Sequence, residues 1–291
     1  MNDFKDKVAV FTGAGSGFGL EFARLGARLG MKLVLADIQK DALDAALVEV
    51  RVAGADATSV LCDVAHAGDV ESLAGVTRER FGAAHLLFNN AGVGGTGGFL
   101  WENSEKDWQW VLGVNLWGVI HGIRSFVPMM MAQGERCHVV NTASVAGLLS
   151  VPMAGVYNAS KHAVVTISET LHHDLRLAGA NIGVSVLCPA FVRTGIADSH
   201  RNRPAHLADE RPLTPSQEVS RAAMQKAIGS GRLGAAEVAQ MTFDAVRQDR
   251  FYVITHPKIM TSVQLRHRDI EEGRPPSDPF SFKPDVATRV A

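Results

Sequence analysis

Tyr157 and Lys161 stand four residues apart, and Ser144 precedes the tyrosine by thirteen residues. Positions i and i+4 share one face of a helix, so the phenol and the ammonium are expected to be neighbours. A free tyrosine has a pKa of about 10, too high for a base at neutral pH. A lysine cation beside it lowers that pKa, and a serine hydroxyl is suited to holding a substrate oxygen. The three residues therefore fit proton transfer at an alcohol or carbonyl oxygen, although a half-buried tyrosine and a solvated lysine on an ordinary helix would show the same spacing.

The segments that must position these residues follow a repeating pattern. Nearly continuous apolar runs, typical of strands buried on both faces, alternate with amphipathic segments. This alternation predicts βαβ units and an α/β fold with a parallel sheet covered by helices on both faces. The predicted strands are 8–11, 32–36, 58–62, 85–88, a run around 139–140, 182–187 and 251–255, and the predicted helices are 20–29, 41–52, 69–81, 105–131, 157–177 and 235–247.

Residues 197–233 break this pattern. They are rich in arginine, histidine and proline and show only weak helical periodicity. So long an excursion in a compact domain is usually functional, often as a lid. We therefore expect one domain over residues 1–273, a substrate loop or lid at about 195–234, and an extended, proline-rich tail over 274–291.

The composition excludes several classes of protein. The chain has 291 residues, 46% of them hydrophobic, which is enough for a large core, and its net charge of −1 offers no basic surface for nucleic acid or an anionic membrane. Three widely spaced cysteines form neither a metal motif nor a disulfide framework, and His172 and His173 have no partners at metal-ligand spacing. The first residues do not resemble a signal peptide, and no apolar run reaches membrane-spanning length. We expect a cytoplasmic protein without a bound metal.

A glycine-rich turn links the first strand to the first helix. Its spacing is Thr12-Gly13-x-x-x-Gly17-x-Gly19, and Asp37 ends the next predicted strand. Glycines in such a turn let backbone amides and a helix N-terminus approach a diphosphate, and an acidic residue after the second strand can accept hydrogen bonds from ribose hydroxyls. A tight turn and a helix N-cap would explain the same residues without a ligand. We favour the dinucleotide site because both features follow their strands in the order that such a site needs.

Together these motifs resemble the classical short-chain dehydrogenase/reductase family. The resemblance covers about two-thirds of the chain and implies a single Rossmann-type, doubly wound domain with seven parallel strands and a nicotinamide cofactor. The residues that carry it are the glycine turn, Asp63, Asn89-Asn90-Ala91-Gly92, Asn115, Ser144, Tyr157-x-x-x-Lys161 and Pro189-Ala190-x-Val192-x-Thr194.

The resemblance also implies a role for each residue. Tyr157 would be the general acid/base, Lys161 would lower its pKa and hold the nicotinamide ribose, and Ser144 would polarise the substrate oxygen. Asn115 would bend its helix locally and hold a water that relays the proton to Lys161. Cofactor contacts are expected at Gly13, Ser16, Gly17, Phe18, Gly19, Asp37, Ile38, Asp63, Val64, Asn89, Ala91, Gly92, Pro189, Val192 and Thr194, together with Tyr157 and Lys161.

Two details concern the cofactor. Ala190 stands where the family usually has glycine, so the backbone there must suit alanine or the loop must shift slightly. A 2′-phosphate needs cationic partners, but residues 14–16 are neutral and Asp37 is followed by Ile38. We therefore expect NAD rather than NADP.

The substrate is less defined by the sequence. Residues 94–101 and the apolar side chains of Leu148, Leu149, Val151, Met153, Phe191 and Ile196 are candidate pocket walls. They favour a bulky aromatic or alicyclic secondary alcohol or ketone, unless they only pack the core. The Arg/His-rich stretch 200–206 is expected to be a solvated or intersubunit surface.

We consider three functions, of which one fits these features best. The favoured one is an NAD-dependent alcohol dehydrogenase or carbonyl reductase, acting on a small molecule and assembling as a homodimer or homotetramer, as the family resemblance implies. A non-catalytic NAD sensor would not need a complete proton-transfer set. A nucleotide-sugar epimerase or dehydratase would carry a different glycine spacing and a larger C-terminal domain than the residues after Thr194 provide.

Overall fold

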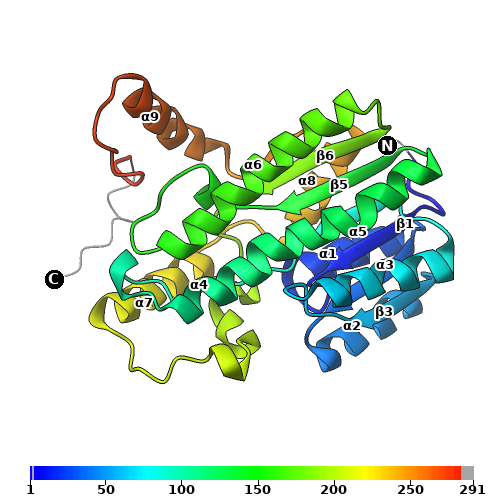
Figure 1. The fold of residues 1–291 in the computed structure, drawn as a ribbon, viewed down its shortest axis with the longest axis horizontal. Helices are drawn as coiled ribbons and strands as arrows, with labels where there is room; N and C mark the ends of the chain where they lie inside the picture. The colour runs from blue at the N-terminus through cyan, green and yellow to red at the C-terminus, as the bar shows by residue number, and fades with distance from the viewer. Residues whose placement is uncertain (2, 283–291) are drawn as a thin grey trace.

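The alternating pattern folds into a parallel sheet. The computed structural model describes residues 1 and 3–282, and in them seven strands pair in parallel in the order β3-β2-β1-β4-β5-β6-β7 (Figure 1). The predicted Rossmann-type α/β class is confirmed. The strands are β1 (Val8–Thr12), β2 (Lys32–Asp37), β3 (Ala57–Leu61), β4 (Leu86–Asn89), β5 (Cys137–Thr142), β6 (Ile182–Cys188) and β7 (Tyr252–Ile254).

Helices cover both faces of this sheet. Apolar side chains of α1, α2 and α8 pack on one face, and those of α3, α5 and α6 pack on the other. The helices of the described residues are α1 (Gly17–Arg28), α2 (Lys40–Val52), α3 (Ala67–Phe81), α4 (Glu105–Leu112), α5 (Gly118–Gln133), α6 (Gly155–Leu177), α7 (Pro215–Gly229), α8 (Ala235–Arg247) and α9 (Met260–Glu271).

The long helix expected over 105–131 is interrupted where Asn115 lies. Residues Gly113–Trp117 form a π-helical turn between α4 and α5, in which the Gly118 amide bonds to the Gly113 carbonyl five residues earlier. Such single π turns are rare and are frequent at functional sites. The turn produces the local irregularity that the resemblance implied for this helix.

The weakly periodic excursion contains more structure than expected. α7 begins with a capping box in which the Thr214 hydroxyl accepts from the Gln217 amide and the Gln217 side chain accepts from the Thr214 amide. Glu102, at the end of the 3-10 turn Leu100–Glu102, also accepts hydrogen bonds from Thr214 and Ser216. The apolar periodicity of α7 is weak, so this helix depends on its cap and on these tertiary hydrogen bonds.

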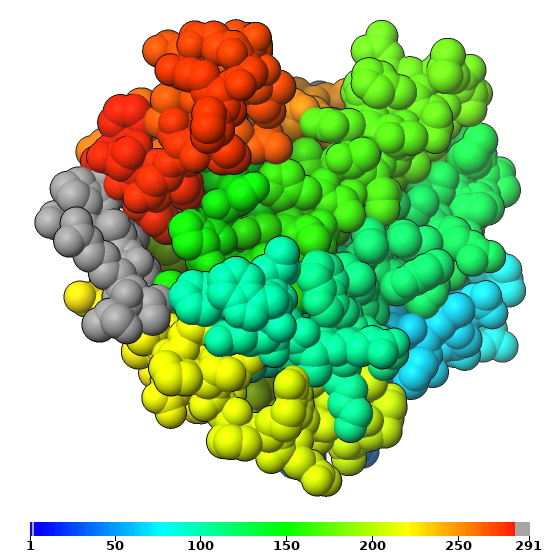
Figure 2. Space-filling view, turned by 60° about the vertical axis from the view of Figure 1, so that its left-hand side comes forward, coloured from blue at the N-terminus to red at the C-terminus, as the bar shows by residue number. Residues whose placement is uncertain are grey.

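The sequence reading did not anticipate α9. It follows β7 and, with the residues after it, forms a lobe at one corner of the molecule (Figure 2, orange to red). The chain then turns back: the Ser277 amide bonds to Asp269, and the Ser262 hydroxyl bonds to the Pro279 carbonyl. The rest of the expected tail, residues 283–291, lies outside the described residues.

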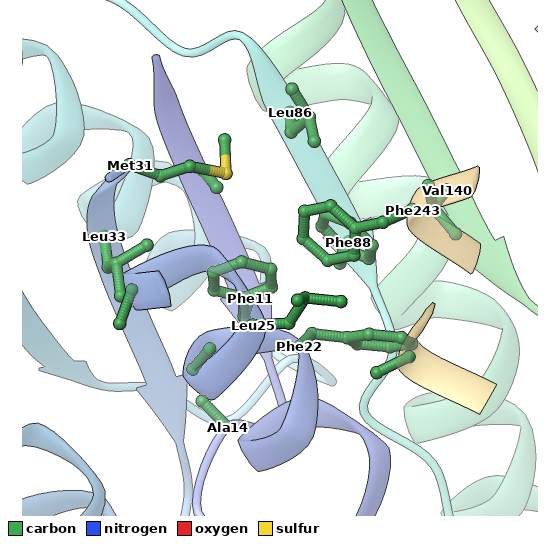
Figure 3. Close-up of a cluster of buried hydrophobic side chains, with 14 of the residues drawn as sticks. Phe11, Ala14, Phe22, Leu25, Met31, Leu33, Leu86, Phe88, Val140 and Phe243 are labelled. Atoms are coloured by element: carbon green, nitrogen blue, oxygen red, sulfur yellow. The ribbon is translucent and has the colours of Figure 1, made fainter. Parts of the chain in front are cut away.

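A cluster of phenylalanines fixes the strands that precede the glycine turn. Phe88 of β4 lies 4.8 Å from Phe11 of β1, 4.8 Å from Phe22 of α1 and 5.4 Å from Phe243 of α8, centroid to centroid (Figure 3). All four rings are fully buried, and each contributes about 1.5–3 kcal/mol through burial. The cluster joins α1 and α8 to the two central strands, so the ends of β1 and β4 are held rigidly.

The strand order reverses between β1 and β4. At such a reversal the connecting chains leave in opposite directions, and a crevice opens at the carboxyl ends of the strands. The residues singled out from the sequence follow these strand ends, so the fold brings them to one edge of the sheet.

Candidate active site

A cavity of about 420 Å³ lies at this edge. One end is lined by Asp37, which ends β2, and by Asp63, which follows β3; the other is lined by Ser144, Tyr157 and Lys161. Among the described residues, no group of three or more His, Cys, Asp or Glu side chains could hold a metal ion. None of the described helices is long and apolar enough to cross a membrane. The cavity is the candidate functional site.

Tyr157 lies in the first turn of α6 and faces this cavity. Burial raises the pKa of Tyr157 above its ordinary value, and a hydrogen bond with the Ser144 side chain opposes that rise. Ser144 itself is held at the end of β5, where its hydroxyl accepts from the Ala146 amide at 3.1 Å and lies 3.4 Å from the Pro189 carbonyl oxygen. The phenol and the serine hydroxyl therefore share one small polar spot in an apolar wall.

Lys161 is one turn further along α6. Its Nζ lies 5.7 Å from the centroid of the Tyr157 ring and donates to the Thr142 carbonyl at 2.9 Å. Because the side chain is only 3% exposed, burial lowers the pKa of Lys161 to about 8. In the protein alone, burial disfavours the charged forms of both Tyr157 and Lys161, and the lowering of the Tyr157 pKa by this lysine stays a prediction.

Asn115 is fully buried and does not line the cavity. Its side-chain oxygen accepts from the Val93 amide at 2.8 Å, and its Nδ2 donates to the Val93 carbonyl and to the Ser160 hydroxyl. Ser160 in turn donates to the Tyr157 carbonyl at 2.7 Å. The side chain thus joins the loop after β4 to the start of the Tyr157 helix, and the water relay implied by the resemblance stays a prediction.

The glycine turn is open towards the cavity. Gly13 and Gly17 have φ angles of +67° and +54°, which favour glycine, and a Cβ at Gly19 would overlap the Gly13 carbonyl. Gly19 itself does not line the cavity, so its role is this close packing. Ser16 caps α1 without a side-chain hydrogen bond in the described structure, and Ser16, Gly17 and Phe18 line the cavity. The free amides of the helix N-terminus therefore suit a diphosphate.

The carboxylates at the far end are partly engaged by backbone amides. Asp37 accepts from Gly15 at 2.8 Å and from Gln39 at 2.9 Å, and Asp63 accepts from Ala65 at 3.0 Å. Each oxygen has two acceptor sites, so both carboxylates keep capacity for hydroxyl or amino donors. Ile38 and Val64 line the cavity beside them. These residues suit the adenosine part of a dinucleotide.

Asn89 differs from its neighbours. It is buried, donates to Asn141 at 2.9 Å and does not line the cavity, while a Cβ at Gly122 would overlap its side-chain oxygen. It therefore joins β4, β5 and α5 and does not reach a ligand from this position. The remaining predicted residues Ala91, Gly92, Pro189, Val192 and Thr194 all line the cavity.

Two residues near these positions explain details that the sequence left open. The Thr12 hydroxyl accepts from the amides of Asn90 and Ala91 at 2.9 and 3.0 Å, which fastens the loop after β4 to the end of β1. Ala190 lines the cavity and is not among the described non-glycine residues with positive φ, so alanine fits without strain.

The substrate wall differs from the predicted one. Val151, Phe191 and Ile196 line the cavity, but Leu148, Leu149, Met153 and residues 94–101 do not. The glycines of 94–101 instead lie against other segments; a Cβ at Gly97 or Gly98 would overlap Ser220 or Gln217 of α7. Lining residues that the sequence analysis did not identify are Gln109, Trp110, Val114, His206, Leu207, Met224 and Ile228.

Residues 200–206 are not a simple solvated surface. The Arg203 guanidinium bonds to the buried Asp107 carboxylate at 2.7 Å and lies 5.1 Å from the Trp110 ring, and Asp107 also accepts from Thr96. Arg203 is 12% exposed and Asp107 3% exposed, so this pair is a buried anchor. The expected solvated surface is wrong at Arg203 because α4 covers it.

Comparison with known proteins agrees with this geometry. Residues 7–205 match the short chain dehydrogenase family, so the chain belongs to that family and is an oxidoreductase of it. A CLA biosynthesis dehydrogenase/reductase from Lactiplantibacillus plantarum is 34% identical over 94% of this chain and 97% of its own length. A C alpha-dehydrogenase from a Sphingobium strain is 32% identical over 100% of this chain and 94% of its own.

A solved structure is also similar. A short chain dehydrogenase/reductase from Burkholderia phymatum in complex with NAD is 57% identical, with a TM-score of 0.95 over 97% of this chain and 100% of that one. The family resemblance inferred from the motifs is confirmed.

Proposed function

We propose that this protein is an NAD(H)-dependent oxidoreductase that interconverts a bulky secondary alcohol and its ketone. The observation that carries the proposal is the single cavity wall formed by Ser144, Tyr157 and Lys161, continuous with the glycine turn and Asp37. A nicotinamide bound there would donate or accept the hydride, and the protein would bind, orient and handle the proton.

Ser144 and Tyr157 act on the substrate oxygen. In the direction of alcohol oxidation, the Tyr157 phenolate takes the hydroxyl proton while Ser144 holds the same oxygen, and in reduction the Tyr157 phenol gives the proton back and becomes the phenolate. Since burial raises the pKa of Tyr157, the phenolate needs positive charge nearby, and Lys161 is the cation that lines the same wall. Its Nζ is fixed by the Thr142 carbonyl, so its position relative to the ring does not depend on solvent.

The cofactor preference follows from Asp37. A carboxylate at the end of β2 can accept from ribose hydroxyls and repels a 2′-phosphate. The similar Burkholderia phymatum protein is described in complex with NAD, which supports the same cofactor for this chain.

The substrate half of the cavity is mainly apolar. Trp110, Phe191, Ile196, Leu207 and Met224 contribute to it, with Gln109 and His206 as polar exceptions. Such a wall binds a large apolar body through burial and supplies few hydrogen bonds. It favours an aromatic or alicyclic substrate over a sugar.

A substrate panel tests the proposal. Aryl and cyclic secondary alcohols would be incubated with NAD or NADP and read at the NADH absorbance band, with short aliphatic alcohols as the comparison. We expect turnover with NAD and a preference for the bulky alcohols. Binding of NADH without turnover of any alcohol or ketone would favour the sensor, and a preference for NADP would contradict the role of Asp37. The homodimer or homotetramer and the cytoplasmic location stay predictions.

A further inference from the structure

The segment 195–207 extends to the end of the cavity proposed to hold adenosine, opposite the proposed substrate half. Gln39, which follows Asp37 and Ile38 at the adenosine end, donates from its Nε2 to the Asn202 side-chain oxygen at 2.8 Å. The two residues are 163 positions apart and both line the cavity. The segment 195–207 also supplies Ile196 and Leu207 to the substrate half. One segment therefore borders both halves.

Arg201 lies in this segment and lines the cavity. Its Nη1 donates to the carbonyls of Gly195 at 3.1 Å and Asp198 at 2.9 Å. Gly195 follows Thr194, and a Cβ at Gly17 would lie 3.5 Å from the Thr194 Cβ. The guanidinium is thereby fixed to the backbone next to Thr194, which lies beside the first residue of α1, and within the described residues its Nε and Nη2 have no hydrogen-bond acceptor.

The charges around the cavity make this position distinctive. Of the residues that line it, all within the described part of the chain, Lys161 and Arg201 are the lysine and arginine side chains, and Lys161 is buried at the catalytic end. The glycine turn contains no basic residue. A diphosphate against the amides of α1 would carry negative charge that the turn itself does not neutralise. A guanidinium with two free nitrogens presents the fork that phosphate oxygens bind.

We propose that segment 195–207 is a clamp on the dinucleotide as well as a substrate lid. Arg201 pairs with the diphosphate, and the Gln39–Asn202 hydrogen bond closes the segment over the adenosine half. The proposal rests on the dinucleotide site of the proposed function, and it adds a cation that the glycine motif does not contain. It also connects cofactor binding to the shape of the substrate half, since Ile196 and Leu207 belong to the same segment.

The test compares Arg201→Gln with Arg193→Gln. Arg193 is an exposed arginine in the same region that does not line the cavity, so its variant controls for the loss of one positive charge. Dissociation constants for NADH, ADP-ribose and adenosine would be measured by titration without any substrate. We expect Arg201→Gln to weaken NADH and ADP-ribose by about tenfold, to leave adenosine unchanged, and to reduce the salt dependence of ADP-ribose binding. Arg193→Gln should leave the affinities for NADH and ADP-ribose near those of the wild type.

A second measurement addresses the closure. The variants Gln39→Ala, Asn202→Ala and their combination form a double-mutant cycle on the ADP-ribose dissociation constant, in which we expect the double variant to be no weaker than either single one. An Arg201→Gln protein that binds ADP-ribose as the wild type does, or that loses adenosine equally, would overturn the diphosphate pairing. Loss of affinity for NADPH alone would overturn it as well and assign the arginine to a 2′-phosphate. Additive effects of Gln39→Ala and Asn202→Ala would overturn the closure. If the wild type binds neither NADH nor ADP-ribose, the proposed function itself fails.

Discussion

Two polar clusters, each of which contains a serine, lie at different positions along β5 and β6. Beyond the carboxyl end of β5, Ser144 lies with Tyr157 and Lys161 on the wall of the cavity. Nearer the start of the same strands, the His138 Nε2 lies 2.8 Å from the Ser185 hydroxyl, and its Nδ1 lies 3.7 Å from the Asp249 carboxylate. A serine in contact with a histidine that is in turn close to an aspartate would suggest a nucleophilic triad.

The second cluster is unable to do that chemistry. The Ser185 hydroxyl donates its proton to the Arg250 carbonyl at 2.6 Å, so His138 must donate to the serine oxygen rather than accept from it. Both side chains are fully buried and neither lines the cavity. Burial lowers the pKa of His138 to about 3, which keeps the imidazole neutral.

The two clusters share a serine, and besides its different partners they differ in access to the cavity and in the direction of proton donation. The Ser144 cluster opens into a cavity and leaves its phenol free to exchange a proton with a ligand, while the His138 cluster spends its hydrogen bonds on the protein. The first is expected to control activity and the second stability.

The strongest way to break this comparison is a matched pair of substitutions. Tyr157→Phe should lower kcat by about 10³-fold because the proton acceptor is lost, while the NADH dissociation constant is retained. Ser185→Ala should leave kcat unchanged and lower the free energy of unfolding by about 1–3 kcal/mol, since His138 loses its acceptor. Steady-state kinetics and denaturant unfolding of both variants check the pair. An active Tyr157→Phe enzyme, or an inactive but folded Ser185→Ala enzyme, would reverse the assignment.

A smaller effect concerns the lysine cation. Lys161→Met should lower kcat/KM for alcohol oxidation by about 10²-fold at pH 7, where Lys161 is protonated. Because the pKa of Lys161 is about 8, the wild type loses this cation as pH rises, so the difference between the two proteins should narrow towards pH 9.5. Rates from pH 6 to 10 measure this, with the exposed Lys40→Met as the control. A difference that stays constant over that range would mean that the lysine acts by packing and not by charge.

The buried histidine gives the smallest and most specific signal. Its folded pKa of about 3 is below the ordinary value of 6.5, so the unfolded state binds a proton that the folded state does not. The free energy of unfolding is therefore unaffected by protonation of this histidine above pH 6.5. It falls as pH drops from 6.5 towards 3, by up to about 1.4 kcal/mol per pH unit, because only the unfolded state is protonated there. Unfolding free energies between pH 7 and 5 should fall less steeply in His138→Gln than in the wild type. His173→Gln, an exposed site, should keep the wild-type slope; equal slopes in all three proteins would contradict the assignment.

The sequence was sufficient to predict the sheet and the position of Ser144, Tyr157 and Lys161 on one cavity wall. The strands are buried on both faces and the motifs follow strand ends, so local patterns determine where Ser144, Tyr157 and Lys161 lie. The sequence did not reveal that the pKa of Tyr157 is raised, because the pKa depends on how deeply distant segments bury the phenol. Asn89 and Asn115 match the family motif, but their side chains are occupied by Asn141 and Val93, contacts that spacing does not reveal.

The sequence also did not reveal features that depend on contacts between distant segments. Trp110 belongs both to a buried cluster and to the cavity wall, because Leu207 of the segment after β6 packs against α4. The Gln39–Asn202 bond joins positions 163 residues apart, and neither residue belongs to a motif. Long-range contacts of this kind follow from the completed fold and not from any window of sequence.

The segment 195–207 has a consequence for how this enzyme can change. Ile196 and Leu207 line the cavity, and Asn202 bonds to Gln39 near Asp37, all on one short length of backbone. If the proposed clamp holds, mutations in this segment that widen the pocket will also disturb retention of the coenzyme, and selection for a new specificity will meet a trade-off there. Variation at Gln109 or Val114, which line the cavity from outside this segment, offers a route to new substrates without that penalty.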